Sequence, residues 1–374
     1  MLSKRALKIE ASEIRKAFDL ARSLKDPIDL SIGQPDFEVP DAVKDAAIES
    51  IKRGFNRYVT TQGIPELREK LIQQFTQRFG FAPGGLMVTS GVAGAIVLCL
   101  MVILDEGDEV VITDPYFAMY KHIINITGGT PRFANTYPDF KLRREAFEKA
   151  ITPRTKAVII TTPSNPTGVI YSREEIMMVV DLCKKNNLLL ISDEVYRTFV
   201  YDGAVESAVK YYDKVLLADG FSKAYGMPGW RLGYAAGPAE LIERMTILQQ
   251  WSFICAPPPF QKAAVVAMDT DMSPIIREFH RRRDLVCEIL NGKFNMVKPE
   301  GAFYVFPEAP ACRDGSGAGR SGGNGSEFVK KAAQNSVLIV PGRAFSEQDT
   351  HFRISYATSE EKLRKGLEIL LKLA

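Results

Sequence analysis

Short apolar runs recur between about residues 85 and 236, and stretches with helical periodicity separate most of them. Strands buried on both faces appear in a sequence as continuous apolar runs, and their alternation with helices is typical of a parallel sheet. The pattern therefore predicts an α/β domain in which helices sandwich a mostly parallel sheet. The expected strands are LMV (86–88), EVVIT (109–113), AVIIT (157–161), LLLIS (188–192), KVLLA (214–218) and RLGYAAG (231–237).

Two of the intervening helices have recognisable limits. One is expected from about Val92 to Leu104. The other begins at Ser172, where Glu175 completes a capping box, and continues to about Asn187.

The two ends of the chain have a different pattern. Residues 275–374 predict an α+β unit with helices near 275–292 and 327–335, short strands, and a last helix capped by Thr358 with Glu361. We therefore expect a large domain over 41–274, and a smaller α+β domain formed by 275–374 with residues 1–40 as an amino-terminal arm. The Gly/Ser-rich stretch 314–326 is expected to be a mobile surface loop rather than a phosphate cradle, because no strand leads directly into it.

Length and charge place the chain in a broad class. With 374 residues, two domains are the default expectation, and 46% apolar with 25% charged residues is ordinary for a globular protein. A net charge of +3 with interspersed signs argues against a nucleic-acid surface. The triplet Arg281-Arg282-Arg283 is interpreted as the solvated face of a helix.

The cysteine, histidine and hydropathy patterns argue against a metal-binding, secreted or membrane-spanning protein. The five cysteines (99, 183, 255, 287, 312) form no C-x-x-C, which favours a reducing compartment, and the three histidines (122, 280, 351) share no ligand spacing, so no metal is expected. No apolar run approaches the roughly 20 residues that span a bilayer, and the amino terminus has no apolar signal core. We expect a cytoplasmic protein without membrane or nucleic-acid partners.

Polar and aromatic residues follow the predicted strands. Because ligands bind at the carboxyl ends of parallel strands, these residues are expected on one rim of the sheet. The segments are Ser90–Gly94, Asp114–Phe117, Thr162–Gly168, Asp193–Tyr196 and Asp219–Lys223.

The residue types on this rim suit one cofactor. A helix start binds phosphate, an aromatic ring stacks on a flat heterocycle, a buried carboxylate holds a pyridinium proton, and a lysine forms a Schiff base with an aldehyde. Together they predict a site for pyridoxal 5′-phosphate. Each feature alone has a commoner explanation, such as a surface lysine, an Asp turn or a core Phe117; their order within one sheet is what is specific.

The chain resembles the class I, fold-type I aminotransferases of the aspartate aminotransferase superfamily. The resemblance runs from about Ile9 to Leu373. It rests on SIGQPDF (31–37), RYVTTQGIPELREKL (57–71), TSGVAGA, DPYFAMY, SNPTG, SDEVY, FSKAYGMPGWRLGY, PEGAFYVFP and FRISYATS.

The resemblance implies a role for each matching residue. Lys223 would bind the cofactor covalently and move the substrate's proton, Asp193 would pair with the pyridine nitrogen, and Asn165 and Tyr196 would contact the ring's phenolic oxygen. Phe117 would stack on the ring. The phosphate would be bound by the Val92 and Ala93 amides, Ser222, Arg231, and Tyr58 from a neighbouring subunit, so a homodimer is implied. The substrate would be held by Arg353 at its α-carboxylate, with Gly33 and Asn165.

The substrate stays open on the sequence alone. By the family resemblance, several aspartate-preferring relatives have a lysine where this chain has Ala93. The segment WSFICAPPPFQK (251–262) suits an apolar or aromatic substrate side chain as well as an acid, and it is equally explained by plain core packing. An aspartate- or aromatic-type L-amino acid as donor with 2-oxoglutarate as acceptor is the leading hypothesis. The main alternative is a carbon–sulfur β-lyase of the same fold, and a non-catalytic cofactor-binding regulator follows it. A nicotinamide dehydrogenase is disfavoured because no G-x-G-x-x-G follows a first strand.

Overall fold

The computed structural model describes residues 4–7, 9–11, 13, 26–311 and 323–374. Its largest element is a seven-stranded sheet with the strand order β2-β8-β7-β6-β5-β3-β4. All neighbouring pairs are parallel except those of β8, which runs antiparallel to both β2 and β7. The strands are β2 (Gly85–Thr89), β3 (Glu109–Asp114), β4 (Thr130–Asn135), β5 (Thr155–Thr161), β6 (Leu189–Asp193), β7 (Val215–Gly220) and β8 (Gly233–Gly237).

Helices bury both faces of this sheet, as the apolar runs predict. Alternate residues of one strand enter different cores: Val110 and Ile112 of β3 belong to one cluster and Val111 to the other. The first cluster includes α5 (Gly91–Ile103), α6 (Ala118–Ile126) and α10 (Ala239–Trp251). The second includes α3 (Asp41–Lys52), α4 (Pro65–Phe79), α7 (Arg144–Ala150), α8 (Arg173–Asn186) and α11 (Pro258–Ala267). The predicted fold class is confirmed by this architecture.

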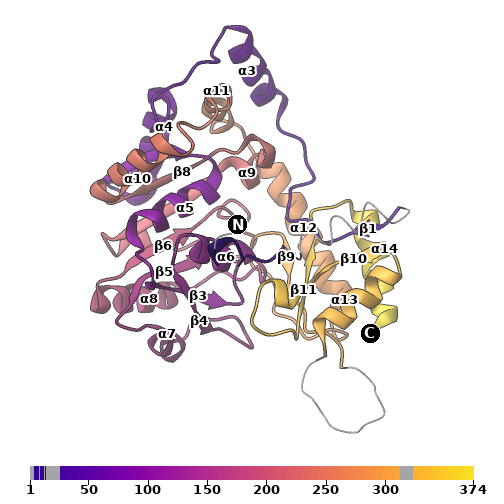
Figure 1. Ribbon diagram of the computed structural model, residues 1–374. Coiled ribbons are helices and arrows are strands. Elements are labelled where there is room, and N and C mark those ends of the chain that lie inside the picture. Colours follow the sequence, from indigo (N-terminus) through magenta and orange to yellow (C-terminus); the bar gives the residue numbers. More distant parts are fainter. Residues whose placement is uncertain (1–3, 8, 12, 14–25, 312–322) are drawn as a thin grey trace.

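The carboxy-terminal elements gather beside this sheet (Figure 1). β1 (Ile28–Asp29) pairs in parallel with β10 (Val337–Leu338), so part of the predicted amino-terminal arm joins this group of elements. A second small sheet has the order β11-β12-β9, from β11 (Val340–Pro341), β12 (Phe352–Ser355) and β9 (Tyr304–Val305). The helices are α12 (Ser273–Leu290), α13 (Gly325–Gln334) and α14 (Glu360–Leu373). The domain boundaries proposed from the sequence stay a prediction.

Short helices complete the described chain. They are α1 (Lys4–Leu7), α9 (Phe221–Ala224), and the 3-10 turns η1 (Ala208–Lys210), η2 (Pro228–Trp230) and η3 (Gly342–Ala344). No helix in the described ranges is both long and apolar enough to cross a bilayer. Most of the expected glycine-rich loop, residues 314–322, lies outside the described residues, and its last two positions already belong to α13.

Helix starts test the capping predictions directly. The capping box at the start of α8 is present: Ser172 accepts from the Glu175 amide, and Glu175 accepts from the Ser172 amide. The prediction for α14 is wrong, because its cap is Ser359, whose side chain accepts from the Lys362 amide. Either hydroxyl of the Thr-Ser pair can cap a helix, so sequence alone misplaces the start by one residue.

Two other expectations differ from the structure. Only Arg281 of the arginine triplet is solvated, whereas Arg283 is 1% exposed and donates to Asp202 and to the Pro299 carbonyl. The three positions lie on different sides of one helix, so they cannot share a solvent face. β4 was not predicted because it is an edge strand, TPRFAN, whose residues need not all be apolar.

Candidate active site

The carboxyl ends of the parallel strands surround a cavity of about 310 Å³. Strands β2, β5, β6 and β7 lead into turns whose side chains face it, and β12 and the segment near Gly33 close its other side. A volume of this size is typical of a small-molecule site. Of the residues predicted from the sequence, all except Tyr58 line this cavity: Gly33, Val92, Ala93, Phe117, Asn165, Asp193, Tyr196, Ser222, Lys223, Arg231 and Arg353.

Lys223 is a partly buried lysine whose amine lines the cavity. It lies in α9, the single helical turn that follows β7, and its Nζ donates to the Gly33 carbonyl oxygen at 2.7 Å. Burial, together with the nearby Arg353 and Arg231 guanidinium groups, lowers the pKa of Lys223 to about 8, and the Asp193 carboxylate acts in the opposite direction. An amine with this pKa is partly uncharged near neutral pH, which is what a nucleophilic lysine requires.

Asp193 is a buried carboxylate on the neighbouring strand β6. Its Oδ2 accepts from the Tyr120 hydroxyl at 2.6 Å and its Oδ1 accepts from the Val195 amide at 3.1 Å. Burial raises the pKa of Asp193 to about 6, while the hydrogen bond from Tyr120 lowers it. Among the described residues no Lys, Arg or His forms an ion pair with Asp193, so its charge is available to a bound cation.

Arg353 is a buried guanidinium on β12 that faces the same cavity. It donates to Asn165 Oδ1 at 3.0 Å and to the Ser31 carbonyl at 2.7 Å, and its Nε has no partner within the described chain. The Tyr304 ring lies 4.4 Å from its central carbon. Burial lowers the pKa of Arg353, yet a guanidinium stays charged at any physiological pH. The group is therefore held in place with donor capacity left for a carboxylate.

Two tyrosines and one glycine shape the wall next to Arg353. The hydroxyls of Tyr196 and Tyr304 lie 2.8 Å apart, and burial raises the pKa of both. A Cβ at Gly33 would lie 2.6 Å from Tyr304 Oη. A side chain at position 33 would therefore press against the Tyr304 hydroxyl, and glycine lets this segment lie close to the wall.

The amino end of α5 forms the opposite wall with Arg231 and Ser222. Ser90, the residue before the helix, makes no side-chain cap, so the first amides of α5 are free of a side-chain acceptor. Gly91 has a φ of +68°, and a Cβ there would lie 2.9 Å from Arg231 Nη2. Helix amides together with a guanidinium form a site for an anion such as phosphate.

Several lining residues were missed by the sequence reasoning, and the most important is Tyr120. Its hydroxyl also lies 2.6 Å from Thr161 Oγ1, and its ring packs edge-on against Phe117. It stands three positions after Phe117, so a helix beginning there places both on one face; that spacing was the available signal. The other missed residues are Met119, Thr161, Val195, Pro228 and Tyr304.

Tyr58 lies outside this cavity. Its side chain is 79% exposed, in the connection between α3 and α4. Within one chain it therefore contributes nothing to the site.

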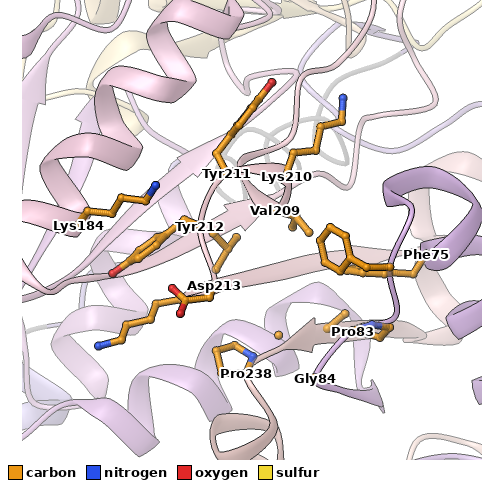
Figure 2. Close-up of a pocket in the computed structure, with 15 residues that line it drawn as sticks. Phe75, Pro83, Gly84, Lys184, Val209, Lys210, Tyr211, Tyr212, Asp213 and Pro238 are labelled. Carbon is orange, nitrogen blue, oxygen red and sulfur yellow. The ribbon is translucent and has the colours of Figure 1, made fainter.

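A larger cavity, of about 740 Å³, lies at the opposite edge of the sheet, where β2 and β7 begin and β8 ends (Figure 2). Two of its lysines already have partners: Lys210 pairs with Glu206 and Lys214 donates to Asn187. Figure 2 shows that the side chains of Lys184 and Lys210 do not converge on a shared point. Size alone therefore does not identify the reactive site. In the described residues no group of three His, Cys, Asp or Glu side chains could hold a metal ion.

Comparisons with known proteins agree with this geometry. The family model for aminotransferase class I and II matches residues 25–370. The chain is 36% identical to a probable aspartate aminotransferase of Methanocaldococcus jannaschii over 100% of both chains. It is also 36% identical to aromatic-amino-acid aminotransferase 2 of Thermococcus litoralis, over 100% of this chain and 98% of that protein. The aspartate aminotransferase of Thermus thermophilus solved with maleate has a TM-score of 0.91 at 34% identity, with 100% of each chain covered.

These matches extend over nearly the whole chain and its fold, and they confirm the family resemblance drawn from the motifs. The chain belongs to the class I and II aminotransferases, a family of pyridoxal-phosphate-dependent transferases.

Proposed function

We propose that this aminotransferase binds pyridoxal 5′-phosphate in the 310 Å³ cavity, with Lys223 as the amine that binds its aldehyde. The observation that carries the proposal is the convergence of three buried or partly buried groups with incomplete partners. They are an amine whose pKa is lowered to about 8, a carboxylate without an ion pair, and a guanidinium with an unpartnered Nε. When bound, the cofactor supplies an electron-withdrawing ring that makes the α-hydrogen of an attached amino acid acidic.

The remaining residues suit the other parts of this cofactor. Asp193 holds a proton on the pyridine nitrogen, because a buried carboxylate favours a cation beside it. Asn165 and Tyr196 contact the phenolic oxygen, and Phe117 stacks on the ring. The phosphate is bound by the Val92 and Ala93 amides with Ser222 and Arg231.

The substrate's α-carboxylate is bound by Arg353 in a bidentate manner, with Asn165 and the Gly33 segment beside it. Lys223 Nζ, which the substrate's amine would displace from the cofactor, would then take the α-proton and return it during transfer. An amine with a pKa of about 8 is partly uncharged near neutral pH and can do this.

We propose an aspartate- or aromatic-type L-amino acid as the donor and 2-oxoglutarate as the acceptor. The relatives named above support this pair, since one is a probable aspartate aminotransferase and one an aromatic-amino-acid aminotransferase. Ala93 lines the pocket and supplies no cation for a side-chain carboxylate, so the aromatic type is not disfavoured.

We propose a homodimer in which Tyr58 binds the phosphate group held by the neighbouring subunit. Exposed large apolar side chains support an interface near Tyr58, on α3 and at the end of α10. α3 lies beside α11 at the top of Figure 1. The exposed residues are Ile48, Ile51, Trp251, Phe253 and Ile254. Light scattering should give twice the mass of one chain, and Trp251→Glu should weaken the dimer. The cytoplasmic location expected from the sequence stays a prediction.

The visible absorption spectrum of the purified, cofactor-loaded protein tests the function. Adding the correct donor should remove the band of the bound cofactor, and 2-oxoglutarate should restore it. A persistent band, with pyruvate and ammonia released from a sulfur amino acid, would instead support the β-lyase. A protein that takes up the cofactor and responds to no amino acid would support the regulator.

A further inference from the structure

Asp219 is a buried carboxylate four residues before Lys223. It lies near the end of β7 and is 3% exposed. Its Oδ1 accepts from the Gly220 amide at 2.7 Å, and its Oδ2 accepts from the Tyr234 hydroxyl of β8 at 2.9 Å. Asp219 does not line the cavity, so it is not a ligand of substrate or cofactor.

The third donor to Asp219 is Arg197, whose Nε bonds the same Oδ2. Arg197 follows Tyr196 directly and belongs to the turn after β6, where its amide donates to the Glu194 carbonyl at 2.8 Å. Its Nη2 also donates to Gln74 of α4 at 3.3 Å. The ion pair therefore joins two turns: one carries Asp193 and Tyr196, and the other carries Lys223.

The backbone of the two turns is also closely packed. The Glu194 amide donates to the Ala218 carbonyl at 2.9 Å, and a Cβ at Gly220 would lie 3.1 Å from the Leu232 carbonyl oxygen. A side-chain bond that locks the end of β7 therefore limits where α9 can begin. A partly buried ion pair whose carboxylate accepts three hydrogen bonds is suited to fixing this turn. Its geometry is well defined even where its net contribution to stability is small.

We propose that the Arg197–Asp219 pair positions Lys223, by fixing the turn that carries it against the turn that carries Asp193 and Tyr196. The pair acts through Lys223 and touches neither cofactor nor substrate. The inference rests on the proposed function of Lys223, and the experiment below separates the two.

The sheet offers a matched control for this pair. Glu109, at the amino end of β3, is also a buried carboxylate that accepts from one arginine and one hydroxyl: Arg154 Nη2 at 2.7 Å and Thr152 Oγ1 at 2.5 Å. It lies at the edge of the sheet away from the cavity. Asp219→Asn with Glu109→Gln, and Arg197→Met with Arg154→Met, therefore remove comparable bonds with and without contact to the Lys223 turn.

The measurements are the rate at which cofactor-free protein takes up pyridoxal 5′-phosphate, kcat and KM for the donor, and the unfolding temperature. Mass spectrometry after borohydride reduction gives the fraction of cofactor on Lys223. We expect Asp219→Asn and Arg197→Met to slow uptake and lower kcat about tenfold or more, with KM within about twofold, because a displaced reactive group slows chemistry more than binding. Glu109→Gln and Arg154→Met should leave uptake and kcat within about twofold, whatever they do to the unfolding temperature.

Milder variants cover the case in which the charge-removing ones fail to fold. Tyr234→Phe removes one hydrogen bond to Asp219 and should lower kcat about two- to fivefold. Arg197→Lys retains the charge and should recover most of the activity lost in Arg197→Met. Wild-type uptake and kcat in all the Asp219-pair variants, with labelling at Lys223 intact, would overturn the positioning role alone. A wild-type protein that is never labelled at Lys223 would overturn the proposed function and this inference together.

Discussion

Two cavities of opposite character lie at the two ends of the strands in the seven-stranded sheet, called here the carboxyl edge and the amino edge. At the carboxyl edge, about 310 Å³ is lined by buried groups with donor or acceptor capacity left over, among them Arg353 Nε and the Asp193 carboxylate. At the amino edge, about 740 Å³ is lined by aromatic rings and by lysines that are exposed or already bonded to neighbours. The smaller cavity is the one in which charge has been buried without local compensation.

That difference separates a reactive site, which is the smaller cavity, from a surface groove, which is the larger cavity at the amino edge. A buried charge without its full set of partners destabilises the free protein, and it is retained where a ligand supplies the missing partner. Exposed charges such as Lys210 have water and Glu206 as partners, so they need no ligand as a further partner. The contrast can be tested one residue at a time.

The largest effect is expected from the two lysines. Lys223→Ala removes the amine of the cavity and should lower turnover at least ~10³-fold, since both cofactor attachment and proton transfer depend on it. Lys210→Ala, in the groove, should retain turnover within about twofold. Steady-state kinetics with a saturating donor measure both.

The fold must be intact for that comparison to have meaning. Far-ultraviolet circular dichroism and the unfolding temperature should be close to wild type in both variants. Near-normal turnover in folded Lys223→Ala would remove Lys223 from the mechanism.

The second effect concerns the substrate carboxylate. Arg353→Met should lower kcat/KM about 10²- to 10³-fold, because a buried, hydrogen-bonded charge pair with the substrate is lost. It also removes a cation that lowers the pKa of Lys223. Cofactor uptake, which should rise with pH through about 8 as Lys223 loses its proton, should then shift to higher pH.

Lys184→Met is the matched change in the groove, and it should alter neither kcat/KM nor the uptake profile. An Arg353→Met protein with unchanged kcat/KM would show that Arg353 does not bind the substrate.

A smaller effect is expected from Tyr120→Phe, which removes the hydroxyl donor to Asp193. The hydrogen bond lowers the pKa of Asp193, so its loss raises that pKa. The charged groups facing Asp193 also include Glu194 and Asp219, which act in the raising direction. The affinity of cofactor-free protein for pyridoxal 5′-phosphate should fall as pH drops through about 6, and the fall should begin at higher pH in the variant. At pH 6 the difference should be on the order of tenfold.

Fluorescence titration across pH 5–8 gives this affinity. Tyr211→Phe, which removes a hydroxyl bonded to Glu206 beside the groove, is the control and should reproduce the wild-type profile. Identical profiles for Tyr120→Phe and wild type would mean that Asp193 is not tuned by Tyr120.

Sequence reasoning succeeds where one local rule decides the outcome. The apolar runs of β3, β5 and β6 are short and alternate with helical segments, which favours buried parallel strands. The carboxyl ends of such strands share a rim, so Asn165, Asp193 and Lys223 could be placed together without a structure. The family motifs added Arg353 and Gly33, which lie far from them in sequence.

It fails where tertiary contacts decide. β4 is formed by a polar edge segment, and Arg283 is buried because Asp202 and the Pro299 carbonyl lie beside it. The contacts of Tyr120 and of the Arg197–Asp219 pair could not be predicted from the sequence for the same reason, because their partners come from other strands and helices.

The smallest effect is expected at the rim of the groove. Phe81 is half exposed, and its ring packs edge-on against Phe75 at a centroid distance of 5.9 Å. Phe81→Ala should lower the free energy of unfolding by about 0.5–1.5 kcal/mol, mostly through that aromatic contact. Donor kcat/KM should stay within twofold, because no charged group of the carboxyl edge contacts this ring. Urea unfolding and steady-state kinetics on the same preparation measure both quantities. A loss of activity larger than about fivefold in a fully folded protein would show that the two edges are coupled, and it would contradict the view that only unsatisfied buried charge marks the functional cavity.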